Sequence, residues 1–512
     1  MSVRPNNDFD ARERLLHLPL AHPTRAEQEF IQLFDATVQS PPDGIALFET
    51  LEQIRSSLCF VREAAARHYL EDAPHLDPDR ETHFQRGIEA IRRMVGGYAS
   101  CAGVKKPWDP ARLAANPRLM RLVATALHRS LYYSGMLIFE HYRAKRELSP
   151  GLWLRHHTLF AAASRMGVGT LSVEDRLFDE SRITHCQAAF VTPLLAEQAG
   201  PYGRNSRELN LIWRWAETVA SKVDVRPFTA SPTNSAFAVN LGQDAPLGVP
   251  QGVENPGTCR QLDTTGATRH LQRILDGLAQ GISPERVGLC DETIEESKGL
   301  LEQLIALWSL DTPQRRSHPR ISGRGTLRLC AGFSAMHHFV LGADRQPNER
   351  AQLKHIEKNA APPHQEEWDI IDQSVSGFRL ASGSSGIRLM PRQLVALGPD
   401  ESGGYRLGLV AWLRREQSGR LLAGIAIVAG TPQAVAARPL SQAHGRRHAY
   451  SHAFLLRRET AQADEGDTIL LPASFRELAG RLDVFHHESR LVGLGKEIRR
   501  GRDFVQLAID RP

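Results

Sequence analysis

Asp372, Ser374 and Gly377 are polar or flexible residues at fixed spacing, and they interrupt an apolar stretch that reads as two half-strands, 368–371 and 378–380. A glycine at position 377 permits a positive φ, so we expect a sharp hairpin turn from which Asp372 and Ser374 project the same way. A carboxylate accepts paired hydrogen bonds from an N–H-rich edge such as that of guanine, and a hydroxyl both donates and accepts. The turn therefore suits a base better than a phosphate.

A second cluster of chemically capable residues precedes this turn by about fifty positions. The short segment QRRSHPRISGRGTLRL holds five arginines, namely Arg315, Arg316, Arg320, Arg324 and Arg328. Guanidinium groups fork onto the O6/N7 edge of guanine, stack on its ring and pair with phosphates. The segment therefore predicts an anionic purine ligand.

The order of these motifs, with the strands LGLVAWL and LLAGIAIV after them, resembles the PilZ domain, a small β-barrel that serves bacteria as a cyclic di-GMP receptor. The resemblance covers roughly residues 313–440. It implies that Arg316 and Arg320 contact guanine and phosphates while Asp372, Ser374 and Gly377 line the guanine-binding turn. Arg315 and Arg324 are additional candidates. Because Arg320 to Arg324 also spells RxxxR, the sequence leaves open which arginine pair is used.

Besides this second RxxxR, the chain departs from the family pattern in the spacing of its motifs. Arg320 and Asp372 are further apart than the family usually shows, so the resemblance requires an insertion near 331–367, part of it helical. If the arginine segment does not return to the DxSxxG turn, the ligand site is incomplete and the domain is a degenerate scaffold.

The helices and strands that must position these residues can be predicted from the spacing of apolar residues, which changes along the chain. Up to about residue 310 the apolar spacing is helical, for example over 116–147, with an irregular, Pro- and Gly-rich linker near 227–258 that leaves a division into two subdomains open. Near residue 313 the spacing becomes strand-like. We therefore expect an α+β multidomain chain: an α-helical region over 1–312, then a PilZ-like antiparallel β-barrel domain over 313–512 that ends in a C-terminal β extension.

Composition excludes several classes of protein. The chain has 512 residues, 41% hydrophobic and 24% charged, as is ordinary for globular proteins. A net charge of +5, without interleaved aromatic and basic residues, argues against DNA or RNA as a partner. Neither a signal peptide nor an apolar run of membrane-spanning length is found, so we expect a cytoplasmic protein.

Motifs for catalysis or metal binding are missing. The six cysteines are scattered, and the His156-His157, His337-His338 and His486-His487 pairs have no carboxylate or thiol at ligand spacing. No nucleophile elbow, zinc-protease, Walker or dinucleotide-binding glycine pattern occurs. We expect no enzyme activity, no metal and no cofactor other than the ligand.

These observations predict a signalling effector in which the helical region contacts a protein partner and the barrel senses cyclic di-GMP. The family resemblance implies outputs in motility, biofilm growth or exopolysaccharide control. The alternative is an adaptor that binds no nucleotide and acts as a scaffold in a pilus, motility or secretion assembly.

Overall fold

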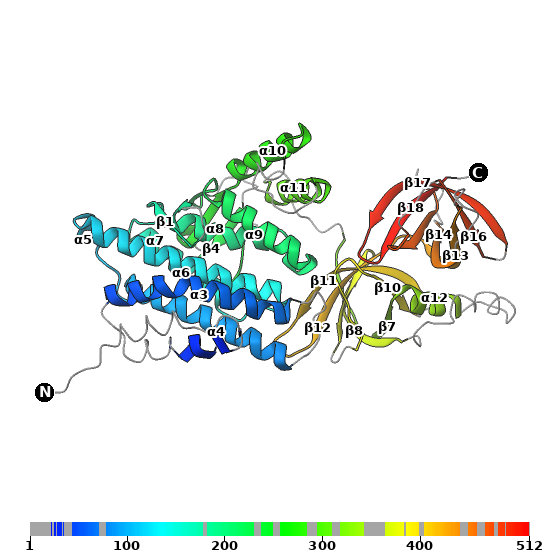
Figure 1. The fold of residues 1–512 in the computed structure, drawn as a ribbon, viewed down its shortest axis with the longest axis horizontal. Helices are drawn as coiled ribbons and strands as arrows, with labels where there is room; N and C mark the ends of the chain where they lie inside the picture. The colour runs from blue at the N-terminus through cyan, green and yellow to red at the C-terminus, as the bar shows by residue number, and fades with distance from the viewer. Residues whose placement is uncertain are drawn as a thin grey trace. The chain divides into compact units, whose positions relative to one another are not determined.

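The computed structural model divides the chain into two units, which are described separately: Met1–Glu71 with Leu76–Arg315, and Asp72–His75 with Arg316–Pro512 (Figure 1). The first is the helical unit and the second the β unit. The structure describes residues 22, 25–26, 28–32, 34, 44–70, 78–177, 182–229, 237–248, 256–283, 294–309, 318–342, 364–382, 386–398, 404–440, 449–457, 466–475, 480–486 and 488–510.

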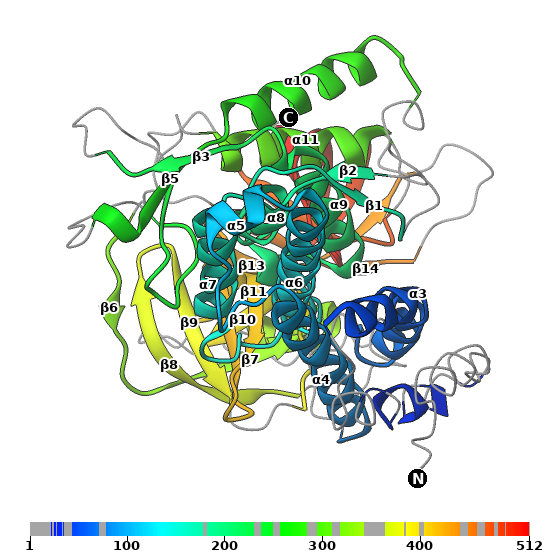
Figure 2. The same cartoon turned by 90° about the vertical axis from the view of Figure 1, so that its left-hand side faces the viewer.

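The helical unit is built around one long central helix, α6 (Pro117–Arg143). Asn116 begins this helix, because its side chain accepts a hydrogen bond from the N–H of Leu119 at 3.1 Å and Pro117 follows at the first helical position. α6 packs against α4, α7 and α8, and Figure 2 looks along this bundle. The bounds of the helices are α3 (Gly44–Tyr69), α4 (Pro78–Cys101), α5 (Pro110–Ala114), α7 (Leu152–Arg165), α8 (Cys186–Gln198), α9 (Ser206–Ala220), α10 (Thr265–Ala279) and α11 (Ile294–Trp308).

The helical unit also contains two small β-sheets. β1 (Val173–Asp175) pairs with β2 (Arg182–Thr184), and a three-stranded sheet has the order β3-β5-β4. Its strands are β3 (Asp224–Pro227), β4 (Phe237–Asn240) and β5 (Cys259–Asp263). The linker near 227–258 therefore carries a short strand, β4, that joins this sheet.

The β unit begins with a barrel that we call the first barrel. Its strands are β6 (Ile321–Ser322), β7 (Thr326–Ala331), β8 (Glu366–Ser374), β9 (Gly377–Ser382), β10 (Leu394–Gly398), β11 (Arg406–Arg415) and β12 (Leu421–Ile427). They lie in the order β6-β8-β7-β10-β11-β12-β9. An additional β8–β9 pairing closes the six strands from β8 to β9 of that order into a ring, and β6 pairs with β8. All these pairings are antiparallel. Trp368, Val410 and Ile425 lie in its buried core.

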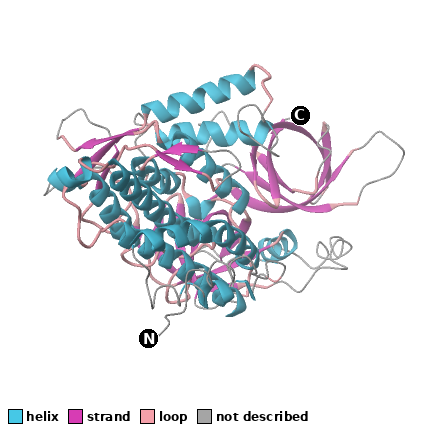
Figure 3. Ribbon diagram, turned by 60° about the vertical axis from the view of Figure 1, so that its left-hand side comes forward, coloured by secondary structure: helices cyan, strands magenta, loops and turns pink. Residues whose placement is uncertain are grey.

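The residues expected to form a C-terminal β extension form a second closed barrel instead. It has the order β13-β14-β15-β18-β17-β16 and appears as a ring in Figure 3. Closure depends on the β13–β16 pairing, which joins strands far apart in the sequence. The strands are β13 (Thr431–Pro439), β14 (Ser451–Arg457), β15 (Thr468–Pro472), β16 (Arg481–Phe485), β17 (Ser489–Arg500) and β18 (Phe504–Asp510).

The two barrels share a hydrophobic core. Helix α12 (Phe333–Gly342) fills part of the predicted insertion, and its Met336 is fully buried. Met336 belongs to the same cluster as Leu394 on β10, Phe454 on β14 and Phe504 on β18. The structure therefore confirms the expected class, a helical region followed by antiparallel β-barrel structure, with one barrel more than the sequence suggested.

A buried ionic cluster ties α3, α6 and β1 together. Arg55 and Arg129 each lie 3.0 Å from the carboxylate of Asp175, and the three side chains are 2–6% exposed. Burial raises the pKa of Asp175, but the hydrogen bond from Arg55 and the charge of Arg129 outweigh burial and hold the pKa at about 2, below its ordinary 3.8.

We expect Asp175→Asn to lower the free energy of unfolding by about 3–5 kcal/mol, because two buried arginines lose their buried counter-charge and keep that of Glu52, which is 30% exposed. Since the folded pKa of Asp175 is lowered, its contribution is complete above pH 3.8 and disappears as the pH falls through about 2. Urea unfolding at neutral pH measures the loss. Glu174→Gln is the control, because Glu174 is 44% exposed and its carboxylate pairs with the exposed Arg176. Equal unfolding free energies for both variants would contradict the assignment.

Candidate nucleotide-binding site

The DxSxxG residues lie on one hairpin of the first barrel. β8 and β9 are joined by the two-residue turn Val375–Ser376, and the register places Ser374 opposite Gly377 and Asp372 opposite Arg379. Asp372 and Ser374 are two positions apart on β8, so their side chains leave the same face of the strand. The structure brings these residues together as the sequence predicted.

Gly377 is required for a different reason from the one expected. Its φ is not positive, so the expectation of left-handed backbone at this position is wrong. A Cβ added there would instead lie 2.2 Å from the carbonyl oxygen of Ile425, on the neighbouring strand β12. The glycine therefore permits a close approach between β9 and β12 rather than a sharp bend.

The carboxylate of Asp372 is held by two arginines. Arg320 Nη1 donates to Asp372 Oδ1, and Arg379 Nη2 lies 2.7 Å from Asp372 Oδ2. The Asp372 side chain is 14% exposed, whereas Arg320 and Arg379 are 31% and 38% exposed. Each carboxylate oxygen thus has its own cationic partner at a site open to solvent.

Arg320 reaches Asp372 because of strand pairing. β6 pairs with the outer end of β8, with Ser322 opposite Asp372 and Ile321 opposite Gln373. This places Arg320 just beyond the paired residues, beside the hairpin turn. The arginine segment therefore does return to the DxSxxG turn, 52 positions away in the sequence.

Arg379 is a site residue that the sequence analysis missed. The signal was present, because a two-residue turn after Ser374 fixes the hairpin register and puts the second residue after Gly377 opposite Asp372. Counting across the turn therefore predicts a carboxylate–arginine pair.

The remaining predicted arginines have different outcomes. Arg315 and Arg316 lie outside the described residues. Arg324 is exposed, and Arg328 lies on β7 with its Nε 3.8 Å from Glu367 rather than at the turn. Arg320 belongs to both candidate RxxxR pairs, so the choice between Arg316 and Arg324 as its companion stays open.

Further groups at the turn suit a flat heterocycle. Ser374 Oγ lies 3.2 Å from Ser376 Oγ and 3.4 Å from the carbonyl oxygen of Gly377. Ile321 and Val375 are 69% and 84% exposed, which is unusual for apolar side chains beside a charged cluster. The surface therefore combines a carboxylate, a hydroxyl, two guanidinium groups and apolar contact area.

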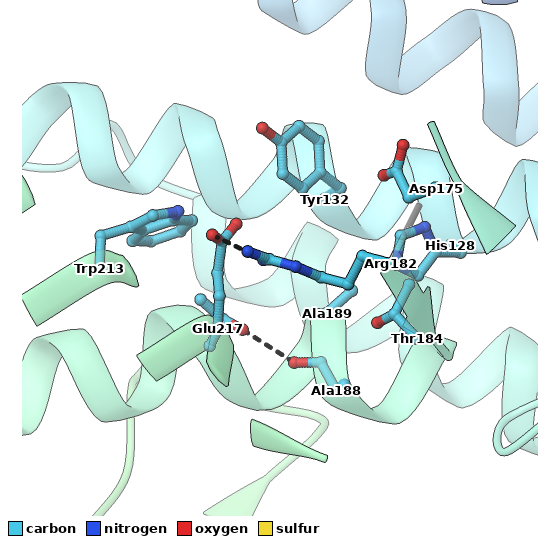
Figure 4. Close-up of a pocket in the computed structure, with 10 residues that line it drawn as sticks. His128, Tyr132, Asp175, Arg182, Thr184, Ala188, Ala189, Trp213 and Glu217 are labelled. Atoms are coloured by element: carbon cyan, nitrogen blue, oxygen red, sulfur yellow. Dashed lines mark hydrogen bonds and ion pairs between the residues drawn. The ribbon is translucent and has the colours of Figure 1, made fainter. Parts of the chain in front are cut away.

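A cavity in the helical unit is a poor alternative. It is lined by His128, Tyr132, Asp175, Arg182 and Glu217, among others, and Figure 4 shows Arg182 pointing toward Glu217. Arg182 Nη1 lies 3.2 Å from Glu217 Oε2, and burial raises the pKa of Glu217. The volume of about 30 Å³ has room for a water molecule or two, far less than a dinucleotide requires.

Metal binding finds no support in the described ranges, where no group of three or more His, Cys, Asp or Glu side chains could hold an ion. His156 and His157 are instead buried next to backbone carbonyls, those of Phe190 and Gln243, each at 3.0 Å. Burial lowers their pKa values to about 3 and about 4. Across the same ranges, the helices are too short or too polar to cross a lipid bilayer.

Comparison with known proteins identifies the family that the chain resembles. Residues 10–230 match the family model for the N-terminal domain of the cyclic-di-GMP receptor FimW, and residues 236–346 match the model for its middle PilZ domain. The chain therefore fits the PilZ-containing cyclic-di-GMP receptors, which confirms the resemblance predicted from the sequence.

One curated protein is similar to the chain over part of its length. The chain is 28% identical over 360 residues to the cyclic-di-GMP receptor FimW of Pseudomonas aeruginosa strain PAO1. The match covers 67% of this chain and 55% of the relative, so the chain spans about half the length of the protein it matches.

The matched intervals and the motifs overlap only in part. The interval for the middle PilZ domain begins in the helical unit and ends at residue 346, before β8. The roles of Asp372, Ser374 and Gly377 therefore rest on the motif and on the geometry of the first barrel.

We expect Gly377→Ala to destabilise the β unit by about 1–3 kcal/mol, because the new methyl group meets the Ile425 carbonyl and β9 must move away from β12. Thermal unfolding followed by circular dichroism measures this effect. Gly466→Ala is the matched control in the same unit, since its nearest neighbour lies 3.9 Å from the added Cβ. A Gly377→Ala melting curve that overlays the control would show that the close approach is unimportant.

Proposed function

We propose that the chain is a cytoplasmic cyclic di-GMP-binding signalling effector, with the ligand bound at the β8–β9 turn of the first barrel. Asp372, Ser374 and Gly377 form the guanine-facing side, and Arg320 with Arg316 or Arg324 forms the cationic side. Similarity to a cyclic-di-GMP receptor with a PilZ domain supports this ligand. The related protein is a receptor by name, which supports a binding role rather than catalysis.

One observation carries the proposal. Arg320 and Asp372, predicted from separate motifs 52 positions apart, are in direct contact. Neither a solvated basic loop nor an ordinary polar turn requires that meeting.

The contacts suggest how the ligand enters. Without ligand, the carboxylate of Asp372 is neutralised by Arg320 and Arg379. The N–H groups of guanine replace Arg320 as donors to Asp372, and the released guanidinium pairs with the O6/N7 edge or a phosphate. Arg379 stays in place and keeps the carboxylate turned toward the ligand. Arg379 is thus a positioning residue.

Coupling to a partner follows from the covalent order of the elements. In the sequence, Arg315, Arg316 and Arg320 lie between α11, the last helix of the helical unit, and β6, the first strand of the β unit. A ligand that fixes Arg320 therefore acts on the connection between the units and shifts the conformations available to it. We propose that the helical unit carries this change to a protein partner, with motility or biofilm growth as the output.

The adaptor function has one observation in its favour. Both oxygens of Asp372 already have arginine partners, so the turn is electrostatically satisfied without a nucleotide. Such an adaptor would act as a scaffold in a pilus, motility or secretion assembly. Isothermal titration calorimetry with cyclic di-GMP separates the two functions.

We expect wild-type protein to bind cyclic di-GMP and Asp372→Ala to weaken binding by about ten- to a hundredfold, the value of charge-assisted hydrogen bonds. Asp369→Ala is the matched control. Asp369 lies on the same strand, pairs with Arg420 at 3.0 Å and is 60% exposed. Absence of binding by the wild type, or equal affinities of the two variants, would leave the adaptor as the better account.

We expect Arg379→Met to weaken binding by about three- to tenfold, because Asp372 loses its fixed partner. Arg379→Lys should restore part of the affinity, which a purely structural role does not predict. In the Arg379→Met, Asp372→Ala double variant the loss should equal that of Asp372→Ala alone. Additive losses would show that Arg379 does not act through the carboxylate.

A further inference from the structure

The helical unit carries a large groove that plays no part in the ligand site. We call it the α4–α7 groove, because most of its lining residues come from these two helices. Its volume is about 820 Å³, within the range of specific binding pockets. The lining residues are Phe34, Leu47, Arg93, Val95, Gly96, Gly97, Ala99, Ser100, Val104, Lys105, Gly151, Leu154, Arg155, Thr158 and Leu159.

The floor of the groove is apolar. Phe34, Leu47, Val95 and Leu159 belong to the core of the helical unit and are 2–8% exposed. At the mouth, Leu154 is 40% exposed, which is high for a leucine beside a cavity. A ligand in this groove therefore gains most from apolar groups that displace water.

Small residues on α4 leave the mouth open. Gly96 and Ser100, one helical turn apart, are both exposed. No atom of the described residues would lie within 4 Å of a Cβ added at Gly96, so none of these residues fills the space over this part of α4. The backbone of a docking helix can approach such a surface closely.

The charged residues of the groove limit which ligands can bind there. Its charged lining residues are Arg93, Lys105 and Arg155, and the described lining includes no acidic residue. Arg93 already contacts Glu89, with its Nε 3.2 Å from the carboxylate, so the exposed Lys105 and Arg155 provide most of the available positive charge. The nearby carboxylate of Asp244 is used as a cap, accepting from the N–H of Leu154 at 3.0 Å.

Cyclic di-GMP does not fit this chemistry, because a polar dinucleotide gains little from an apolar floor. An amphipathic helix does, since it lays leucine-like anchors at i, i+3, i+4 and i+7 into a groove between helices. We propose that the α4–α7 groove docks an amphipathic helix of a protein partner whose flank is acidic. This inference rests on the part of the proposed function that assigns a protein partner to the helical unit.

The test uses the full-length chain and a fluorescein-labelled 18-residue peptide with leucines on one face and glutamates on the other. Fluorescence anisotropy without cyclic di-GMP should show saturable binding. Replacing the glutamates by lysines should weaken binding at least about tenfold. Because cyclic di-GMP is left out, the result does not depend on whether the barrel binds nucleotide.

Filling the groove should abolish docking. Gly96→Leu adds a side chain into the open space and raises helix propensity, so we expect at least about a tenfold loss of peptide affinity without loss of stability. Gly87→Leu is the control. Gly87 is also on α4, and in the described part of the chain no atom lies within 4 Å of a Cβ added there, but Gly87 is not among the residues that line the groove.

Reversing the charge of the groove should reverse its preference between the glutamate peptide and the lysine peptide. Lys105→Glu with Arg155→Glu should favour the lysine peptide, whereas Lys106→Glu, an exposed neighbour outside the lining, should not. Equal binding of both peptides, equal losses in Gly96→Leu and Gly87→Leu, or no peptide binding by the wild type would overturn the proposal. Binding to phosphatidylglycerol vesicles without peptide binding would overturn it in favour of a lipid surface.

Discussion

The carboxylate of Asp372, shared between Arg320 and Arg379, is the interaction on which this account depends. It connects three strands: β8 carries the carboxylate, β9 carries Arg379, and Arg320 immediately precedes β6. Because it lies at a partly exposed turn, its two ion pairs add little to stability and remain available for exchange. Breaking a buried pair such as Arg55–Asp175 costs more free energy, because the charge that loses its partner has no access to water.

The sequence predicted local structure, but it did not predict the strand pairings between residues far apart in the chain that close a barrel. Strands β11 and β12 follow directly from alternating and continuous apolar runs, and α6 follows from its periodicity. The second barrel could not be recognised, because its last pairing joins Ala436 on β13 to Phe485 on β16 and depends on every strand between them. No local pattern records such a pairing.

The sequence predicted part of the candidate site, but not how its residues are held in place. Residue types and order selected Arg320, Asp372 and Ser374, and the structure brings Arg320 to the turn. The role of Gly377 could not be derived, because the Ile425 carbonyl that excludes a side chain comes from a strand about fifty residues later. Arg379 could have been found by counting the hairpin register. The proposed ligand site and the proposed partner surface differ in chemistry: the first is a polar, cationic turn on the β unit, and the second is an apolar groove with a cationic rim on the helical unit.

Hydrogen–deuterium exchange of the full chain, with and without cyclic di-GMP, tests the central claim most directly. The account predicts slower exchange in the peptides that contain residues 318–323 and 369–379, because the ligand closes over both at once. Unchanged exchange in these two segments at saturating ligand, or slower exchange in only one of them, would contradict a site built from the arginine segment and the β8–β9 turn.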